Sequence, residues 1–339
     1  MKHKKTFGCF AFVLLLFVGC SGLLLIGLQK NREDAGWVED WDDSYGTVFR
    51  NLRYGERTNN TYDLTVPKGE AKDGLLLFVH GGSWMGGDKS DMEYACRRYA
   101  KIGYVTATMN YSFINSKEEY ASFPMMDLEV VACVKAIMGE LGKLNITVNN
   151  LAIGGHSAGA QIAATYAMKH AEDSPIPVRF AIVMTGPVDL ARMFSVEEDR
   201  LAKIRKGLQE GNPSPEGKQD ADNLVMNTSG IQMRPDMYHK HIIDSLINLS
   251  SAASLVDSLS VPVVMAYGEK DNLVRPEQYH SLVSAYKWHE RPYTLIVYPN
   301  SGHDLGGDPD KAQELRATVL EYLDKYFVKP VGGINLVHT

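Results

Sequence analysis

Apolar and polar positions along most of the chain follow two periods, which predict strands and helices in alternation. Residues 62–66 alternate and end at Pro67, whereas residues 75–79 form a continuous apolar run, as expected for a strand buried on both faces. Similar apolar runs predict further strands at 104–109, 151–154, 180–185, 261–267 and 293–298. Apolar residues at helical spacing predict helices at 90–101, 124–141, 158–170 and 309–327. This alternation predicts an α/β fold with a mostly parallel sheet and helices on both faces.

One long segment interrupts the alternation. About 70 residues separate Asp189 from Val261 without a strand signal, and residues 210–223 are rich in Gly, Pro, Asn and charge. Compact domains rarely carry so long an insertion without a role. We expect a cap of helices and loops at about 190–260, within a domain at 47–330. Residues 29–46 are then a polar, acidic linker able to fold back on the domain, and 331–339 are a tail.

The N-terminus has a membrane-targeting pattern. Residues 1–5 are basic, and the 22 residues from Phe7 to Leu28 contain no charge, which is enough for a helix to cross a hydrocarbon core of about 30 Å. We favour an uncleaved anchor at 1–28, because the apolar run continues past Cys20 and a cleaved secretory signal is shorter. A cleaved signal, or lipidation of Cys20 in a sequence similar to a lipobox, are the alternatives. Each places the domain outside the cytoplasm, anchored or secreted.

Composition excludes some classes of protein. The 339 residues include 35 Lys and Arg against 41 Asp and Glu, a net charge of −6 that lacks the basic footprint of a nucleic-acid binder. With 45% hydrophobic residues, the chain can form a large core without disulfides or metals. The four cysteines show no CxxC spacing. We expect Cys96 and Cys133, in two predicted helices, to be buried thiols. A disulfide between them is the alternative, and it requires those two helices to be adjacent.

The pattern Gly155-His156-Ser157-Ala158-Gly159 follows one predicted strand and opens the next predicted helix. A sharp strand-to-helix turn presents the serine hydroxyl above the sheet, and small residues on either side avoid a clash within the turn. The N-terminus of the helix favours negative charge that develops there. Ser157 is therefore the predicted nucleophile of a hydrolase.

A serine nucleophile needs a base, and an imidazole base needs an orienting carboxylate. His303 follows the last predicted strand and so lies at the same edge of the sheet as Ser157, which makes it the predicted base. His156 adjoins the serine but points elsewhere in a turn. Asp271 follows the preceding strand and is the predicted carboxylate, with Glu269 as the alternative.

Backbone donors are also needed for the oxyanion that forms on the substrate carbonyl. His80-Gly81-Gly82-Ser83-Trp84 directly follows the strand at 75–79, and glycines let backbone N–H groups approach a substrate closely. We assign the N–H groups of Gly82, Ser83 and Ala158 to this oxyanion hole. We expect Trp84 and residues of the insertion to shape the acyl and alcohol pockets.

Together these residues resemble the α/β-hydrolase superfamily, and most closely its esterases with an HGGG or HGGxW loop, including the feruloyl/acetylxylan-esterase-like and hormone-sensitive-lipase-like groups. Residues 62–67, Asn110-Tyr111 and 271–274 look like landmarks of those esterases. Ser83 replaces a third glycine, which is similar to the HGGxW subgroup. The resemblance covers about 47–327 and implies the α/β-hydrolase fold with catalytic residues in the order Ser…Asp…His, and it implies no metal or cofactor. It also implies that the helices with Cys96 and Cys133 cover opposite faces, which argues against a disulfide.

The expected activity is hydrolysis of carboxylic esters, with short acyl or carbohydrate-linked groups, through an acyl-enzyme. A small serine peptidase similar to the prolyl-oligopeptidase group is the alternative, because that group shares this catalytic domain. Seven propeller blades of about 40–50 residues would consume the whole chain, so the esterase is favoured. A non-catalytic binding protein on the same fold is a third hypothesis, and the complete set of site residues argues against it.

Overall fold

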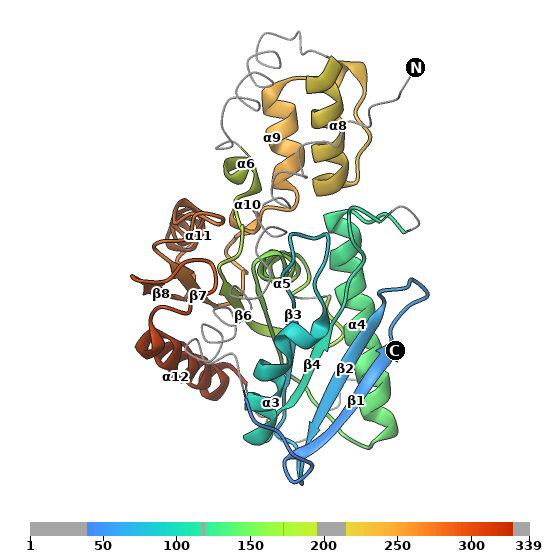
Figure 1. Cartoon of the computed structure of the whole chain (residues 1–339), viewed down its shortest axis with the longest axis vertical. Coiled ribbons are helices and arrows are strands. Elements are labelled where there is room, and N and C mark those ends of the chain that lie inside the picture. Colours follow the sequence, from blue (N-terminus) through green and yellow to red (C-terminus); the bar gives the residue numbers. More distant parts are fainter. Residues whose placement is uncertain (1–38, 117–118, 172, 195–214, 328–339) are drawn as a thin grey trace, which may run out of the picture.

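The computed structural model describes residues 39–116, 119–171, 173–194 and 215–327, in which eight strands form one sheet (Figure 1). In chain order the strands are β1 (Gly46–Arg53), β2 (Thr61–Pro67), β3 (Leu75–Val79), β4 (Val105–Met109), β5 (Leu151–His156), β6 (Val178–Met184), β7 (Val263–Gly268) and β8 (Tyr293–Tyr298). Their order across the sheet is β1-β2-β4-β3-β5-β6-β7-β8. The strands from β4 to β8 are parallel, and β2 is antiparallel to both of its neighbours. The predicted α/β class with a mostly parallel sheet is confirmed.

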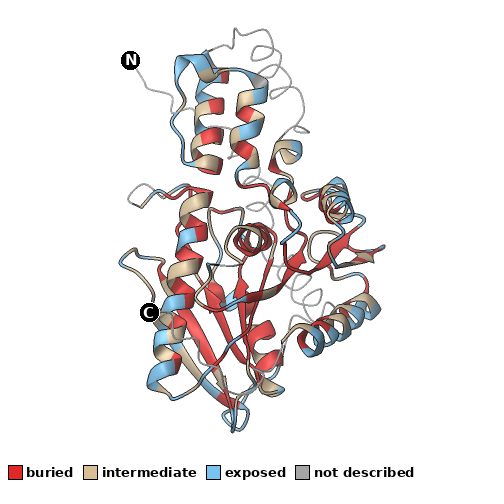
Figure 2. Cartoon of the chain, turned by 180° about the vertical axis from the view of Figure 1, so that it is seen from behind, coloured by how far each residue is buried: buried red, intermediate tan, exposed pale blue. Residues whose placement is uncertain are grey.

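Helices cover both faces because alternate residues of the central strands point to opposite sides. Leu75, Leu77 and Val79 of β3 belong to the apolar cluster that includes α4 (Phe123–Lys143), α5 (Ala158–Lys169) and α11 (Glu277–Trp288). Leu76 and Phe78 belong to the cluster with α3 (Glu93–Lys101) and α12 (Pro309–Tyr326). Figure 2 shows the strands buried between these two layers.

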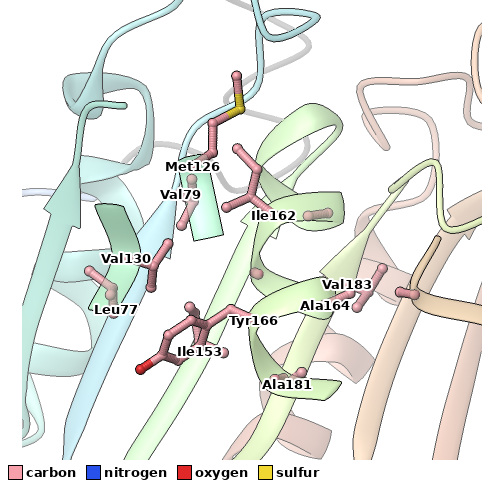
Figure 3. Packing of buried hydrophobic residues seen from close by; sticks show 14 of the residues in the cluster. Leu77, Val79, Met126, Val130, Ile153, Ile162, Ala164, Tyr166, Ala181 and Val183 are labelled. Carbon is pink, nitrogen blue, oxygen red and sulfur yellow. The ribbon is translucent and has the colours of Figure 1, made fainter. Parts of the chain in front are cut away.

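Helix α5 is the centre of the larger cluster. Ile162 and Tyr166 of α5 lie among side chains of the strands, including Ile153, and side chains of α4 such as Met126 and Val130 (Figure 3). Every one of these side chains is at most 1% exposed. Full burial of such a side chain stabilises a fold by roughly 1.5–3 kcal/mol, so α5 and the turn before it have a rigid support.

The two described cysteines confirm the layering. Cys96 on α3 and Cys133 on α4 are both free and buried, and they belong to the clusters on opposite faces of the sheet. Burial raises the pKa of both thiols, so they remain protonated and inert. The expectation of buried thiols without a disulfide is therefore confirmed.

The described part of the insertion is helical and contains no strand. It consists of α6 (Leu190–Met193), α8 (Pro215–Ser229), a 3-10 turn η2 (Pro235–Met237), α9 (Lys240–Asn248) and α10 (Ala252–Leu255). Helix α8 begins inside the stretch that is rich in Gly, Pro, Asn and charge, with a proline in its first position, where the missing N–H has no cost. Helices α8 and α9 lie together at one end of the molecule, beyond α4 and α5 (Figure 1).

Two described elements were not predicted, namely β1 and α11. The last residues of the predicted linker pack against the domain, because the carboxylate of Glu39 lies 2.8 Å from Lys101 and 3.4 Å from Arg98 on α3. No helix within the described ranges is long and apolar enough to cross a bilayer. The predicted anchor at 1–28 lies outside the described residues, as does the tail at 331–339.

Candidate active site

Ser157 occupies the turn between β5 and α5, and its backbone is left-handed, with φ of 54°. Such a conformation is costly for a residue other than glycine, so it needs support from its surroundings. The N–H of Ser157 donates to the carbonyl of Met184 at 2.9 Å. A side chain at Gly155 would collide with the backbone of Gly159, and one at Gly159 with the carbonyl of Val79. The small residues of the pattern are thus required by close backbone approach.

Three side chains from separate loops meet at this turn. Nε2 of His303 lies 2.8 Å from Oγ of Ser157, and Nδ1 of His303 lies 2.7 Å from Oδ2 of Asp271. An ionised carboxylate only accepts hydrogen bonds, so Nδ1 carries the proton and Nε2 is left to accept from the serine hydroxyl. The structure therefore brings Ser157, His303 and Asp271 together in the arrangement expected from the sequence.

Asp271 is held by the backbone of its own loop. Its Oδ1 accepts the N–H groups of Leu273 and Val274, both at 2.8 Å, and its side chain is fully buried. The alternative carboxylate, Glu269, accepts the hydroxyl of Tyr279 at 2.7 Å instead. Asp271, and not Glu269, is therefore the partner of His303.

His156 contacts the backbone of His303 and not the serine hydroxyl. Its Nε2–H donates to the carbonyl of His303 at 2.9 Å, and the hydroxyl of Thr185 donates to the same oxygen at 3.4 Å. The carboxylate of Asp308 holds the start of this loop, since it accepts Ser301 Oγ at 2.6 Å and both nitrogens of Asn300 at 2.9 Å. Burial opposes ionisation of Asp308, but these hydrogen bonds keep its pKa below the usual value. We did not predict Asp308, because nothing in its spacing marks it.

The loop after β3 lies directly beside Ser157. A side chain carbon on Gly81 would come within 3.2 Å of Cβ of Ser157. Gly82 has φ of 115°, and a side chain there would meet the backbone of Gly86. Within the described part of the chain, the N–H groups of Gly82 and Ser83 donate to no backbone acceptor. Ala158 is the first residue of α5, where an N–H has no partner within the helix.

The buried side chain of His80 holds this loop in place. Its imidazole is fully buried, stacks on Tyr111 with 4.5 Å between ring centres, and donates from Nδ1 to the carbonyl of Gly81 at 2.6 Å. Burial lowers the pKa of His80, so the ring stays neutral. The hydroxyl of Tyr111 donates to the carbonyl of His80 at 3.3 Å. Tyr111 belongs to the Asn110-Tyr111 pair noted in the sequence, and in the structure its hydroxyl makes this contact with the loop.

The expectation that Trp84 shapes a substrate pocket is wrong. The indole is only 3% exposed and stacks on Phe123 of α4, with 4.6 Å between ring centres. The side chain points into the core because Ser83 and Trp84 both have left-handed backbone, with φ of 53° and 59°. Two such residues in succession reverse the direction of the loop, which the spacing of the motif does not indicate.

The residues of the site offer acid–base and nucleophilic chemistry. Within the described ranges, no three His, Cys, Asp or Glu side chains are arranged to hold a metal ion. What the arrangement provides is a buried carboxylate, a partly exposed imidazole and a hydroxyl in hydrogen-bonded series. Such a series can deprotonate the hydroxyl as it attacks a carbonyl group.

Comparison with known proteins agrees with this geometry. The BD-FAE family model matches residues 62–286, about two thirds of the chain, and the chain therefore belongs to this family, which is of the α/β-hydrolase esterase type. A probable isoprenylcysteine alpha-carbonyl methylesterase of Oryza sativa subsp. japonica is 27% identical over 130 residues. That match covers 37% of this chain and 29% of the relative, so the chain spans under a third of that protein.

Two solved structures share the fold. A truncated carbohydrate esterase from gut microbiota is 18% identical, with a TM-score of 0.61 over 84% of this chain and 99% of that one. Esterase B from Lactobacillus rhamnosis, solved with an inhibitor, is 14% identical, with a TM-score of 0.63 over 90% of this chain and 98% of that one. At these identities the likeness shows the fold alone.

Proposed function

We propose that this member of the BD-FAE family is a serine carboxylesterase, with Ser157 as nucleophile, His303 as general base and Asp271 as orienting acid. The observation that carries the proposal is the pair of hydrogen bonds, 2.7 and 2.8 Å long, that runs from Asp271 through His303 to the hydroxyl of Ser157. The esterase type of the family supports it.

The reaction proceeds in two acyl transfers. Nε2 of His303 takes the proton of Ser157 as Oγ attacks the ester carbonyl, and the carbonyl electron pair moves onto oxygen. The N–H groups of Gly82, Ser83 and Ala158 stabilise this oxyanion, and each such donor contributes about 10²–10³-fold in rate. The intermediate collapses, and the alcohol leaves with the proton from His303. Water then attacks the acyl-enzyme by the same route and releases the acid.

Asp271 acts throughout by its charge and its position. The side chain is out of contact with solvent, so its attraction for the imidazolium that forms on His303 is weakly screened. Two backbone N–H groups fix one of its oxygens while the other faces Nδ1 of His303. The imidazole is thereby held in the tautomer that leaves Nε2 free to accept a proton.

The proposed substrates are esters of short acyl groups or esters linked to carbohydrate. One solved structure with this fold is a carbohydrate esterase, which supports the carbohydrate-linked class. The relative that is a probable methylesterase supports esters of a small alcohol. A screen should therefore contain p-nitrophenyl esters of increasing acyl length, acetylated xylo-oligosaccharides and simple methyl esters.

Two variants test the proposed nucleophile and base. We expect Ser157→Ala and His303→Ala to lower kcat on the best ester by about 10³-fold or more while the proteins remain folded by circular dichroism. Ser157→Ala should also abolish labelling by a fluorophosphonate probe. Ser258→Ala, in an exposed loop, is the matched control and should keep full labelling.

Adding aminoacyl-anilides to the substrate screen, beside the labelling experiment, separates the rival functions. Turnover of aminoacyl-anilides but of no ester would make the protein a peptidase. If the fluorophosphonate probe labels neither the purified full chain nor Ser157→Ala, the fold serves binding without catalysis.

A further inference from the structure

The loop that carries Gly82 and Ser83 is strained and must be held in place. Gly82 is followed by two residues with left-handed backbone, Ser83 and Trp84. A bulky side chain rarely adopts this conformation, which persists only where the surrounding structure imposes it. Trp84 has the largest side chain of the loop, so its contacts are the natural source of that constraint.

The indole of Trp84 makes one hydrogen bond. Its Nε1–H donates to Oε1 of Gln161 at 2.9 Å. Trp84 is 3% exposed and Gln161 is fully buried, so water does not compete for this bond. Stacking on Phe123 restrains the plane of the indole, whereas the bond to Gln161 fixes where the ring lies within that plane.

The amide of Gln161 can adopt only one orientation. Its Nε2 donates to Oγ1 of Thr165 at 2.9 Å and to the carbonyl of Ser250 at 3.0 Å. The hydroxyl of Thr165 in turn donates to the backbone carbonyl of Gln161 at 2.8 Å, so it is available as an acceptor. A flipped amide would direct its NH₂ group at the indole N–H, donor against donor.

Gln161 also belongs to the turn that holds the nucleophile. It lies on α5, and its backbone N–H donates to the carbonyl of Ser157 at 3.2 Å. The side chain of Gln161 contacts the insertion at Ser250, which lies between α9 and α10. The hydroxyl of Ser250 donates to the carbonyl of Thr228 on α8 at 2.6 Å. One buried amide therefore connects the loop after β3, the nucleophile helix and the insertion.

We propose that Gln161 is a positioning residue that sets the N–H groups of Gly82 and Ser83 relative to Ser157. It acts through the indole of Trp84, and the insertion supports it through the carbonyl of Ser250. The inference rests on the proposed esterase function and goes beyond it, because Gln161 contacts neither the substrate nor the three reacting side chains. Loss of the bond between Gln161 and Trp84 misaligns the oxyanion donors without removing them.

The test is a double-mutant cycle with a readout of the oxyanion hole. Trp84→Phe keeps an aromatic ring and removes the indole N–H, Gln161→Met removes the amide at similar length, and a third variant combines both. The measurements are kcat and KM on p-nitrophenyl acetate and the inhibition constant of phenylboronic acid. Its tetrahedral adduct on Ser157 resembles the intermediate and depends on the same donors.

We expect each single variant to lower kcat about tenfold, less than the 10²–10³-fold for complete loss of a donor. KM should change by less than about twofold, and phenylboronic acid should bind weaker by the same factor as kcat falls. The double variant should be no more than about twofold worse than the more damaged single variant, because both remove one interaction. Tyr166→Phe is the matched control, since it removes a partly buried 2.7 Å bond from another side chain of α5 to Ser174.

The proposal is overturned if the single variants melt at lower temperature but keep kcat and boronate affinity at the level of Tyr166→Phe. Gln161 would then be a packing residue only. If Gln161→Met does not fold, Trp84→Phe alone decides, because it retains the ring that fills the site. Absence of ester hydrolysis in the unmodified protein refutes the proposed function itself, and that measurement is made first.

Discussion

Asp271 and Glu269 are two residues apart in one loop, yet only one of their carboxylates reaches the imidazole of His303. The N–H of Asp271 donates to the carbonyl of Gly268, and this turn directs the two side chains to different neighbours. The sequence places both residues at the edge of the sheet and favours Asp271 only by its distance from the strand. Which carboxylate faces inward depends on the turn, and that is a property of the folded loop.

The substitution Asp271→Asn separates geometry from charge. The amide oxygen can still accept the N–H groups of Leu273 and Val274, so we expect the loop to remain folded. Its NH₂ group would then face Nδ1 of His303 and favour the tautomer with the proton on Nε2. That tautomer cannot accept the proton of Ser157, so kcat should fall by about 10³–10⁴-fold, the order of the loss caused by the same substitution in Ser-His-Asp proteases. Steady-state kinetics on the best ester would measure the loss.

Glu269→Gln is the control in the same loop. Its side chain contacts the hydroxyl of Tyr279, which an amide oxygen can also accept. We expect kcat to stay within about twofold of the unmodified enzyme. The opposite result, with Asp271→Asn active and Glu269→Gln inactive, would transfer the orienting role to Glu269.

At the scale of elements, the buried strands and the helices that flank them were predictable, whereas β1 and α11 were not. The β3 strand is predictable because all five of its residues are buried and apolar. Within the described structure β1 has a partner strand on one side only, and four of its eight residues are exposed while one is buried, so its polar positions give little periodic signal. Helix α11 buries Gln278 along with Tyr279, Leu282 and Tyr286, and this buried polar residue weakens the apolar stripe.

The packing of α4 against α5 contains an ion pair with a buried carboxylate, which makes stability depend on pH. Asp127 is 2% exposed, and its Oδ2 lies 2.8 Å from Nζ of Lys169. Its other oxygen has no hydrogen-bond partner within the described structure. Burial raises the pKa of Asp127 from 3.8 to about 6, although Lys169 opposes the shift. Helix α4 therefore carries, at its contact with α5, a carboxylate that is costly to ionise.

The direction of the effect follows from this pKa. A carboxyl group with a raised pKa in the folded state binds more protons when folded, so stability falls as pH rises between 3.8 and about 6. Over this window the folded state loses about 3 kcal/mol from this group. Asp127→Asn does not titrate, so the unmodified protein should lose stability relative to the variant between pH 4 and pH 7.

Urea denaturation at the two pH values measures this difference. Lys169→Met is the complementary variant, since it leaves the buried carboxylate unpaired and should destabilise more at pH 7 than at pH 4. If the free energies of unfolding of the unmodified protein and Asp127→Asn differ by the same amount at both pH values, the proposed link between Asp127 and pH-dependent stability is wrong.

At the scale of the whole molecule, three segments far apart in the chain form one site because parallel strands end at a common edge. Ser157, Asp271 and His303 each follow a strand, β5, β7 and β8, and this topology makes their meeting predictable. The inward course of Trp84 was not predictable, because it depends on a loop with successive left-handed residues and on an amide of another helix. The packing of the insertion against α4 and α5 was not predictable either, since its sequence carries no motif.

Glu39, the first described residue, contacts the domain at the edge opposite the site. Glu39 is bound to Lys101, the last residue of α3, close before the start of β4, whereas Ser157 follows the end of β5. Strands β4 and β5 both run parallel to β3, so the start of one and the end of the other lie at opposite edges. Glu39, which residues 29–38 separate from the predicted anchor at 1–28, thus lies at the edge opposite Ser157.

The sequence predicts that residues 1–28 are such an anchor, and removing them should change location but not catalysis. We expect the full chain to stay with membranes after an alkaline carbonate wash and a fragment of residues 29–339 to remain in the supernatant. Both should hydrolyse the best ester with kcat within about twofold when normalised to fluorophosphonate labelling. The mass of the mature protein separates the alternatives, because a retained Met1, a shortened N-terminus and a lipidated Cys20 differ in mass. Full chain in the wash supernatant with Met1 retained would contradict the anchor, since an apolar helix of this length does not leave a bilayer in carbonate.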